Sequence, residues 1–383
     1  MAKDGAVLVF NAGSSSLKYR LVAGGTSGAP ENLDQGQVQR IGEAGGDAPD
    51  HAHAVGQVLD GLPDHPIAAV GHRVVHGGAR FREPVRVDDE ALTAIEELAR
   101  WAPLHNPAAV AGIRAARAAL PRVPQLALFD TAFHATLPPA AYTYAIDRHL
   151  AEEYEIRRYG FHGISVRYVV GETARLLERP VTELNMIVLH LGNGASATAV
   201  AAGASVETSM GLTPLEGLVM GTRTGDIDPA AAFYLARARG LSLDQIEDQF
   251  QRHGGLSGLS GDNDVRAVQS RADGGDPEAQ LALEVYCHRI RKYVGAYHAV
   301  LGRLDAVVFT AGVGEHSARI RAMSLAGLKP LDIEVDPGRN GDGDAARFVS
   351  PAASRVAVCV VPTDEERAIA QQTAAVLGLT GSW

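Results

Sequence analysis

A strand–turn–strand pattern occurs twice in this 383-residue chain, at Val7–Lys18 and again at Met186–Ser196. In each copy a short apolar run, suited to one buried strand, breaks into a turn of Gly, Asn and Ser and resumes as a second apolar segment. The repetition predicts two similar domains. If the domains face each other, the two turns present backbone N–H groups and small hydroxyls to one cleft, which is a way to hold a polyphosphate.

Composition narrows the class of protein. With 46% hydrophobic and 21% charged residues, the chain is typical of a globular protein of two or three domains. The formal net charge of -10 and the lack of a Lys/Arg-rich run argue against a nucleic-acid partner. No apolar run approaches the ~20 residues of a membrane-spanning helix, so we expect no membrane partner. The apolar run Ala6–Phe10 is too short for a signal-peptide core.

The two cysteines indicate a cytoplasmic protein. Cys287 and Cys359 lie far apart in the sequence and form no CxxC motif. Neither a disulfide framework nor a cysteine metal site is therefore expected.

Strand and helix signals alternate along the chain, which predicts the α/β class with mixed sheets. Besides the two repeated pairs, we expect strands at 67–70, 125–129, 306–310 and 356–361. We expect helices from Asp88 to a stop at Pro103, from a cap at Asn106 to about Leu120, and at 165–177, 229–239 and 281–304. The Gly-rich segment 24–61, including His51, is expected to form turns, short hairpins and solvated loops.

Three glycine-rich turns follow predicted strands. The first, at 11–18, has Ser14 and Ser16 ahead of Lys18, and a plain hairpin turn would explain it alone. It is not a Walker A motif, because its lysine follows the serines. The turns at 192–194 and 312–314 are further places where backbone can approach a ligand closely. The three turns together favour a nucleotide cleft.

Two arginines lie among glycines and apolar residues rather than on charged helix faces. Arg223 lies between two glycines with no carboxylate partner at a suitable spacing, and a forked cation there suits a phosphoryl group or a carboxylate. Arg73 lies within GHRVVHGG, where a buried structural ion pair is the simpler alternative.

One imidazole and two carboxylates complete the candidates. His162 lies between an aromatic residue and a glycine, and taken alone it is as well explained as a hydrogen-bonded core histidine. Asp130 and Glu365 each follow a predicted buried strand, which indicates a magnesium site or a general base, although helix capping competes for both.

Taken together, these segments resemble the acetate kinase family, which belongs to the superfamily of acetate and sugar kinases, actin and chaperone ATPases. The matching motifs follow family order from residue 7 to residue 366: VLVFNAGSSSLKYRLV, GHRVVHGG, APLHNP, LFDTAFHATLP, RRYGFHGIS, HLGNGAS, TSMGLTPLEGLVMGTRTGDIDP, VFTAGVGEHS and PTDEE.

The resemblance implies two duplicated actin-like (ribonuclease H-like) domains with mixed sheets flanked by helices and the active site in the interdomain cleft. The N-terminal domain would span 1–147, completed by 366–383, and the nucleotide-binding domain would span 148–365. The resemblance also implies a cytoplasmic homodimer. The reaction would be reversible phosphoryl transfer from ATP to acetate, giving ADP and acetyl phosphate, with Mg²⁺ or alternatively Mn²⁺ as the metal.

By the same resemblance, roles fall on individual positions of this chain. The metal would be placed by Asn11 and Glu365, and the phosphates would lie near Ser14, Ser16 and Lys18. The second phosphate loop would be His190, Leu191, Gly192, Asn193 and Gly194, and the adenosine would be approached by Gly312, Val313, Gly314, Glu315 and His316. The loosely matching 261–266 segment would add nucleotide contacts from Asp264 and Arg266.

The reacting groups are assigned in the same way. Arg73 and Arg223 would grip acetate and the transferring phosphoryl group, His162 would stabilise the transition state, and Asp130 would position substrate or metal. The small apolar wall around the acetate methyl would be Val75, Leu104, Phe161 and Pro214. One departure lies beside His162, where Ile164 and Val166 replace a threonine and a histidine of the family motif.

Ionised acetate attacks phosphorus without a general base, so two arginines suit a carboxylate nucleophile better than a sugar hydroxyl. Three alternatives remain open. A propionate kinase differs by one methylene, worth only about 1 to 3 kcal/mol in an apolar pocket. A sugar kinase would need a base and polar partners for hydroxyls. An ATP-gated assembly or chaperone protein would need no small acceptor and no Arg73.

Overall fold

The computed structural model describes residues 5–25, 30–103, 105–341 and 343–383. Contacts divide the chain into two compact units. Unit 1 comprises Met1–Ala135, Gly163–Ser165 and Asp364–Trp383, and unit 2 comprises Thr136–His162 and Val166–Thr363. The domain boundaries at 147/148 and 365/366 remain predictions.

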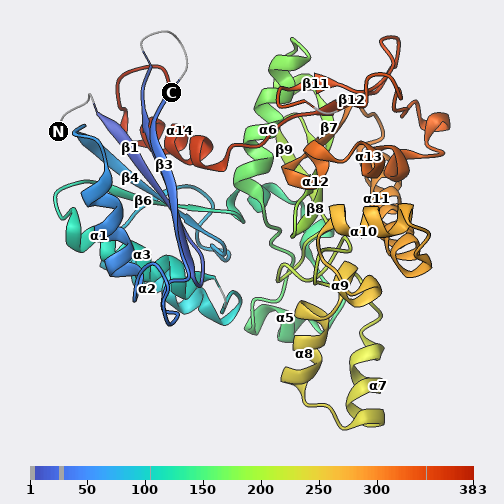
Figure 1. The fold of residues 1–383 in the computed structure, drawn as a ribbon, viewed down its shortest axis with the longest axis horizontal. Helices are drawn as coiled ribbons and strands as arrows, with labels where there is room; N and C mark the ends of the chain where they lie inside the picture. Colours follow the sequence, from blue (N-terminus) through green and yellow to red (C-terminus); the bar gives the residue numbers. More distant parts are fainter. Residues whose placement is uncertain (1–4, 26–29, 104, 342) are drawn as a thin grey trace. The chain divides into compact units, whose positions relative to one another are not determined.

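Unit 1 is built on a mixed sheet of six strands in the order β3-β2-β1-β4-β6-β5 (Figure 1). The β1–β2 pair is an antiparallel hairpin, β1, β4 and β6 run parallel, and β5 is antiparallel to β6. Apolar side chains on both faces of β1 are buried, which is what a central strand requires. The strand bounds are Ala6–Ala12 (β1), Ser16–Ala23 (β2), Glu31–Gln39 (β3), Ile67–Val74 (β4), Val85–Arg86 (β5) and Gln125–Phe129 (β6).

Helices cover this sheet, and the last of them comes from the C-terminal end of the chain. Helix α14 packs against β1 and β4, and it begins where the Asp364 carboxylate accepts from the Arg367 N–H. A Cβ on Gly71 would lie 2.6 Å from Cγ2 of Ile369, so the close approach of α14 to β4 requires a glycine there. The helices of this unit are His51–Gly61 (α1), Asp89–Glu97 (α2), Asn106–Ala119 (α3) and Glu365–Leu377 (α14).

Unit 2 repeats the same topology. Its six strands, read as β9-β8-β7-β10-β12-β11, correspond one for one to the order in unit 1. The pair β7–β8 is an antiparallel hairpin, β7, β10 and β12 run parallel, and β11 is antiparallel to β12. The bounds are Asn185–Leu191 (β7), Ala195–Ala201 (β8), Ala204–Thr208 (β9), Ala306–Thr310 (β10), Arg347–Phe348 (β11) and Ala357–Val360 (β12). The duplication predicted from the repeated strand–turn–strand pattern is therefore confirmed, and with it the fold class.

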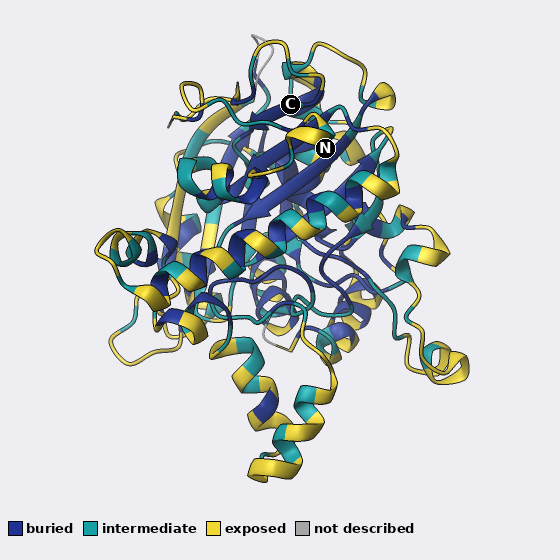
Figure 2. Cartoon of the chain, turned by 90° about the vertical axis from the view of Figure 1, so that its right-hand side faces the viewer, coloured by how far each residue is buried: buried dark blue, intermediate teal, exposed yellow. Residues whose placement is uncertain are grey.

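The longest helix, α11, packs on β8 and β7. Asp276 caps its start, Pro277 occupies the first helical position, and Gly302 with φ of 67° ends it. Figure 2 shows buried strands behind helices whose outer faces are exposed. The helices are Pro139–Tyr142 (α4), Arg148–Glu153 (α5), Gly163–Leu176 (α6), Ala230–Arg239 (α7), Leu243–Arg252 (α8), Gly255–Ser260 (α9), Val265–Asp273 (α10), Pro277–Leu301 (α11), Ala311–His316 (α12) and Ala318–Leu325 (α13).

Two local predictions are wrong. The segment 24–61 holds the nine-residue strand β3 and helix α1, which Asp50 caps by accepting from the His53 N–H at 2.8 Å. His51 therefore begins a helix, and its Nε2 lies 2.9 Å from the Gly13 carbonyl oxygen in the serine turn. The polar, Gly-rich composition masked both elements, because packing against the rest of unit 1 overrides weak local propensity.

The second wrong prediction is the helix cap at Asn106. His105 occupies the cap position of α3, and the buried Asn106 side chain binds His76 instead. Its Oδ1 accepts from the His76 N–H at 3.1 Å, and its Nδ2 donates to the His76 carbonyl at 3.0 Å. Asn106 thus fixes the loop that follows Val75.

Candidate active site

Four predicted residues of unit 1 meet around one guanidinium. Arg73, at the end of β4, donates from Nη2 to Asp130 Oδ2 at 2.6 Å and from Nε to Asp130 Oδ1 at 3.2 Å. Its Nη1 donates to Asn11 Oδ1 at 3.3 Å, and its Nε lies 3.6 Å from Glu365 Oε2. We call Asn11, Arg73, Asp130 and Glu365 the Arg73 cluster. It lies at the carboxyl ends of β4 and β6, where open α/β sheets place ligands.

The charges of this cluster do not balance. Two carboxylates, Asp130 and Glu365, face one guanidinium. Burial raises the pKa of the Asp130 carboxyl above its ordinary value, with Arg73 opposing this shift and Glu365 adding to it. Asp130 is 1% exposed, whereas Arg73 is partly exposed, so the cluster opens toward solvent through the arginine. The buried ion pair that the sequence analysis gave as the alternative for Arg73 is therefore present. The cluster holds one carboxylate more than its single guanidinium can neutralise.

The serine turn lies beside this cluster in the same sheet. The Gly13 N–H donates to the Ser16 carbonyl at 2.7 Å, which closes the turn between β1 and β2, and Ser14 is exposed at its tip. Lys18 is directly opposite Asn11 in the antiparallel register, so both side chains lie on one face of the hairpin. Lys18 is exposed, and its contact with the phosphates stays a prediction.

The predicted apolar wall is distributed over both units. Val75 in unit 1 and Pro214 in unit 2 are half-buried, whereas Phe161 in unit 2 is 1% exposed. Leu104 lies outside the described residues.

In unit 2, two imidazoles stack. The rings of His162 and His190 have their centroids 4.1 Å apart with an interplanar angle of 21°. Nδ1 of His162 lies 3.0 Å from Oγ of Ser196. His162 has φ of 60°, a left-handed backbone at the start of α6, so the fold holds this side chain in a conformation uncommon for a non-glycine residue.

Gly194 brings the imidazole and the second arginine together. A Cβ on Gly194 would lie 3.3 Å from Nη2 of Arg223 and 3.4 Å from Nε2 of His162. The lack of a side chain at this glycine therefore lets a guanidinium and an imidazole both approach the backbone of the loop between β7 and β8. We call Gly194, His162 and Arg223 the Gly194 cluster.

Arg223 is held without a counter-charge. Its Nη1 donates to the Pro214 carbonyl at 2.8 Å, and no carboxylate among the described residues pairs with it. Burial lowers the pKa of Arg223, which remains charged at neutral pH. A half-buried, unpaired guanidinium next to a glycine turn is arranged to receive an anion.

A cavity of about 990 Å³ in unit 2 is lined by Gly192 and Asn193, the two residues that precede Gly194 in the chain. Its lining includes predicted residues from all three unit-2 segments: Gly192, Asn193, Asp264, Arg266, Gly312, Val313 and His316. At its rim, Nη2 of Arg266 lies 2.6 Å from Oδ2 of Asp264, an exposed pair that lowers the pKa of Asp264 to about 2. The volume suits a nucleoside phosphate.

Five predicted nucleotide residues of unit 2, Gly194 among them, are absent from the cavity lining. Leu191 and Gly314 are buried. The Glu315 carboxylate accepts from the Thr363 N–H at 3.1 Å, in the segment that follows β12. His190 supports His162 by stacking. Their proposed contacts with the nucleotide stay predictions.

Sequence reasoning missed several residues that shape this site. The cavity is also lined by residues of α10, by the cap residue of α13 and by a residue of α13 itself: Gln269, Ser270, Asp273, Ser317 and Arg319. Arg321, which is 0% exposed, donates to the carbonyls of Gly314 and Glu315 at 2.9 and 2.8 Å and to Asn340 Oδ1 at 2.7 Å. An arginine in the middle of a helix gives no local signal of such a role.

The departures beside His162 have a structural consequence. Ile164 and Val166 are buried in apolar surroundings, and the hydrogen bond to His162 comes from Ser196 in HLGNGAS. The imidazole is therefore oriented without the family's threonine and histidine.

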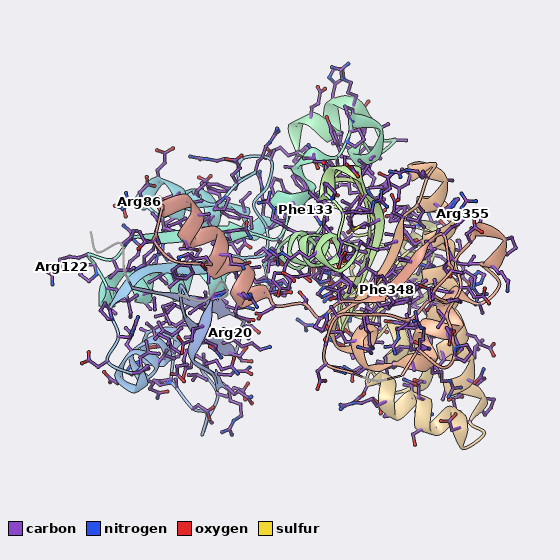
Figure 3. All side chains as sticks on the ribbon, turned by 90° about the horizontal axis from the view of Figure 1, so that it is seen from above. Arg20, Arg86, Arg122, Phe133, Phe348 and Arg355 are labelled. Carbon is purple, nitrogen blue, oxygen red and sulfur yellow. The ribbon has the colours of Figure 1, made fainter. Side chains whose placement is uncertain are left out.

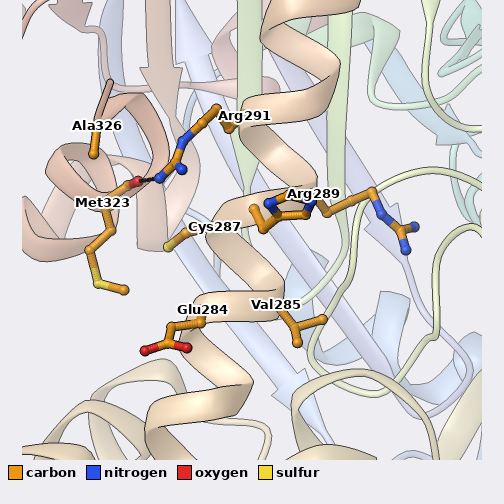
Figure 4. Close-up of a pocket in the computed structure, with 8 residues that line it drawn as sticks. Glu284, Val285, Cys287, Arg289, Arg291, Met323 and Ala326 are labelled. Atoms are coloured by element: carbon orange, nitrogen blue, oxygen red, sulfur yellow. Dashed lines mark hydrogen bonds between the residues drawn. The ribbon is translucent and has the colours of Figure 1, made fainter. Parts of the chain in front are cut away.

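A second cavity, of about 450 Å³, lies between α11 and α13 and is lined by Cys287, Arg289 and Met323 (Figure 4). None of the predicted site residues lines it. Cys287 and Cys359 are both free and both buried.

The donor sets fit a nucleotide and a divalent metal. Within the described residues no three His, Cys, Asp or Glu side chains form a metal-holding group. Magnesium needs no such group, because it is commonly held by one or two carboxylates together with phosphate oxygens and water. The amide oxygen of Asn11 and the carboxylate of Glu365 are hard oxygen ligands of that kind, and the excess carboxylate of the Arg73 cluster favours a cation.

Comparison with known proteins agrees with this chemistry. The model of the acetokinase family matches residues 6–371. The acetate kinase of Streptomyces coelicolor is 54% identical over 401 residues, which covers 98% of this chain and 98% of the relative. The acetate kinase of Leifsonia xyli is 54% identical over 390 residues, covering 96% of this chain and 98% of the relative.

Two solved structures are also similar over nearly their whole length. The acetate kinase of Porphyromonas gingivalis has a TM-score of 0.91 at 38% identity, covering 97% of this chain and 99% of that one. A propionate kinase from Francisella tularensis has a TM-score of 0.89, also at 38% identity, covering 98% of this chain and 100% of that one. No described helix is long and apolar enough to cross a bilayer.

Proposed function

This chain belongs to the acetokinase family, and we propose that it catalyses the reversible, direct in-line transfer of the γ-phosphoryl group of ATP to acetate, giving ADP and acetyl phosphate. The observation that carries the proposal is the Gly194 cluster, where a guanidinium with no carboxylate partner among the described residues and an imidazole both approach one glycine of the loop between β7 and β8.

The Gly194 cluster is suited to the transferring phosphoryl group. In-line transfer places charge on three equatorial oxygens, and preorganised donors aimed at them stabilise the transition state. We assign this role to Arg223 and to Nε2–H of His162. That tautomer leaves Nδ1 to accept from the Ser196 hydroxyl, 3.0 Å away. The cavity lined by Gly192, Asn193 and Gly312 would hold the nucleotide.

The Arg73 cluster is assigned to acetate and to the metal. Arg73 would grip the acetate carboxylate, and the buried Asp130 would hold the guanidinium in place through its two hydrogen bonds. Asn11 and Glu365 would hold Mg²⁺, which when bound neutralises phosphate charge. Acetate is ionised at neutral pH, so none of these residues has to remove a proton from it.

Propionate is the alternative acceptor, because the acetate kinase and the propionate kinase structures are equally identical to this chain. In an apolar pocket one methylene is worth only about 1 to 3 kcal/mol, so the predicted wall residues do not decide between the two acids. We propose acetate as the preferred acid, in line with the 54% identical relatives.

Hydroxylamine trapping of acyl phosphate tests both points. With ATP, magnesium and each of acetate, propionate and butyrate, we expect hydroxamate in the order acetate, propionate, butyrate. The Arg223→Ala variant serves as the inactive control. No hydroxamate from any acid with folded wild-type protein would refute the enzyme assignment, and a preference for propionate would replace the proposed substrate.

We further propose a cytoplasmic homodimer, as the family resemblance implies. Light scattering coupled to size exclusion tests the dimer, and a monomer at micromolar concentration would contradict it.

A further inference from the structure

A polar cleft of about 440 Å³ lies on unit 1, away from every residue assigned above. It is bordered by β5, the start of β6, the end of α3 and the first turn of α2, and it is lined among others by Arg86, Asp89, Arg117, Arg122 and Gln125.

The cleft carries an excess of positive charge. Three guanidiniums line it against one carboxylate, in a protein whose net charge is -10. Nη1 of Arg117 lies 2.8 Å from Oδ1 of Asp89, an ion pair that ties α3 to α2. Arg86 and Arg122, both exposed, have no hydrogen-bond or ion-pair partner in the described part of the chain. Figure 3 labels both, and they lie on the same side of unit 1.

The nitrogen of a buried side-chain amide in the cleft lining also lacks a hydrogen-bond partner among the described residues. Gln125 is 4% exposed, and its Oε1 lies 2.8 Å from Nε2 of His72. Its Nε2 has no hydrogen-bond partner among the described residues. A buried N–H group left unpaired is uncommon and calls for a ligand or water. Because this nitrogen is itself buried, it can reach an anion in the cleft only if the Gln125 side chain moves.

The cleft is separate from the candidate active site. Gln125 begins β6, whereas Asp130 directly follows the end of that strand. Five residues of extended chain span about 16 Å, so the two places lie at opposite ends of the sheet.

We propose that this cleft binds a small polyanion, with the exposed guanidiniums of Arg86 and Arg122 gripping its charged groups. Guanidinium forks pair bidentately with either carboxylate or phosphate, so the shared chemistry is that of a compact, multiply charged anion. The volume suits an organic tricarboxylate or a short polyphosphate and falls near the lower end for small-molecule sites.

Isothermal titration of the full-length protein tests this site with two probes, tricarballylate for carboxylates and inorganic tripolyphosphate for phosphates. The key variant is Arg86→Gln/Arg122→Gln, in which exposed residues change and the fold should persist. Its matched control is Arg82→Gln/Arg114→Gln, which removes the same charge from exposed arginines outside the cleft. Each titration is repeated in the Arg223→Ala background, and sodium chloride keeps the ionic strength constant.

We expect saturable binding of at least one probe that weakens at least tenfold in the cleft variant and less than twofold in the control. The probe that binds more tightly identifies the ligand class. Three outcomes would overturn the proposal: no saturable binding of either probe up to 10 millimolar, equal weakening in both double variants, or loss of all binding in the Arg223→Ala background alone.

Discussion

Nη2 of Arg73 lies 2.6 Å from Oδ2 of the buried Asp130, and the nearby Glu365 leaves this cluster with more negative than positive charge. An arginine already held by a carboxylate is oriented before any ligand arrives, so less conformational entropy is lost on binding. The cost is competition, because acetate must share the guanidinium with Asp130. This arrangement suits a site in which a cation enters together with the acid.

Replacing either arginine by alanine should lower kcat by about 10² to 10³, the range seen when one donor to a developing charge is removed. Arg223→Ala removes the guanidinium beside Gly194, and Arg73→Ala removes the one paired with Asp130. Steady-state kinetics measure the loss, and circular dichroism checks the fold. Arg114→Ala, on exposed helix surface, is the control and should retain full activity. Near-normal turnover in either active-site variant would reject its role.

The His162 imidazole is expected to act on the transition state rather than on substrate binding. The backbone of His162 is left-handed, a conformation that asparagine tolerates well, so His162→Asn removes the ring with little strain. We expect kcat to fall about 10²-fold, with the KM values for ATP and acetate changed less than threefold. A variant that raised KM while keeping kcat would contradict this assignment.

Arg321 is expected to hold the end of helix α12, which borders the nucleotide cavity. Its guanidinium satisfies the carbonyls of Gly314 and Glu315, and methionine would leave those groups unpaired in the interior. Arg321→Met should lower the free energy of unfolding by about 3 kcal/mol or more. Arg321→Lys keeps the charge and should fold, with KM for ATP raised and KM for acetate unchanged. Equal effects on both KM values would indicate a merely structural role.

His72 should make stability depend on pH. Burial lowers the pKa of this imidazole to about 4, below its ordinary value of 6.5, although the Gln125 contact opposes the shift. The unfolded chain therefore binds this proton more readily, and the stability contributed by neutral His72 is lost as the pH falls below 6.5. Between pH 7 and pH 5 the loss amounts to about 2 kcal/mol.

Urea unfolding at pH 7 and pH 5 checks this prediction against His72→Gln, which keeps a polar group beside Gln125. The variant should lose less stability over that interval than the wild type. Identical losses would show that His72 is not the titrating group.

The fold was predictable where the sequence repeats or alternates. The two strand–turn–strand segments became matching hairpins, and the apolar runs at 125–129 and 306–310 became buried parallel strands. Strand β3 and helix α1 were not predicted, because their polar residues gain stability from packing that no local pattern shows. The role of Asn106 was misjudged for a related reason. An asparagine at the start of a helix commonly caps it, but the Asn106 side chain instead accepts from the backbone N–H of His76, thirty residues earlier in the chain.

The candidate site was predictable in its residue types and less so in their partners. Arg73 and Asp130 were each singled out, yet their pairing depends on the adjacency of β4 and β6. Likewise, Arg223, His162 and Gly194 come from separate loops that the fold of unit 2 brings together. Buried supports such as Arg321 and Ser196 carry no motif of their own, so only the packed structure identifies them.

The most direct test of the account is a ³¹P NMR time course with wild-type protein, started once from ATP, magnesium and acetate and once from ADP, magnesium and acetyl phosphate. We predict that both mixtures converge to the same ratio of acetyl phosphate to ATP, with inorganic phosphate appearing no faster than in a protein-free control. Folded protein that released inorganic phosphate from ATP without forming acetyl phosphate would contradict the proposed transfer.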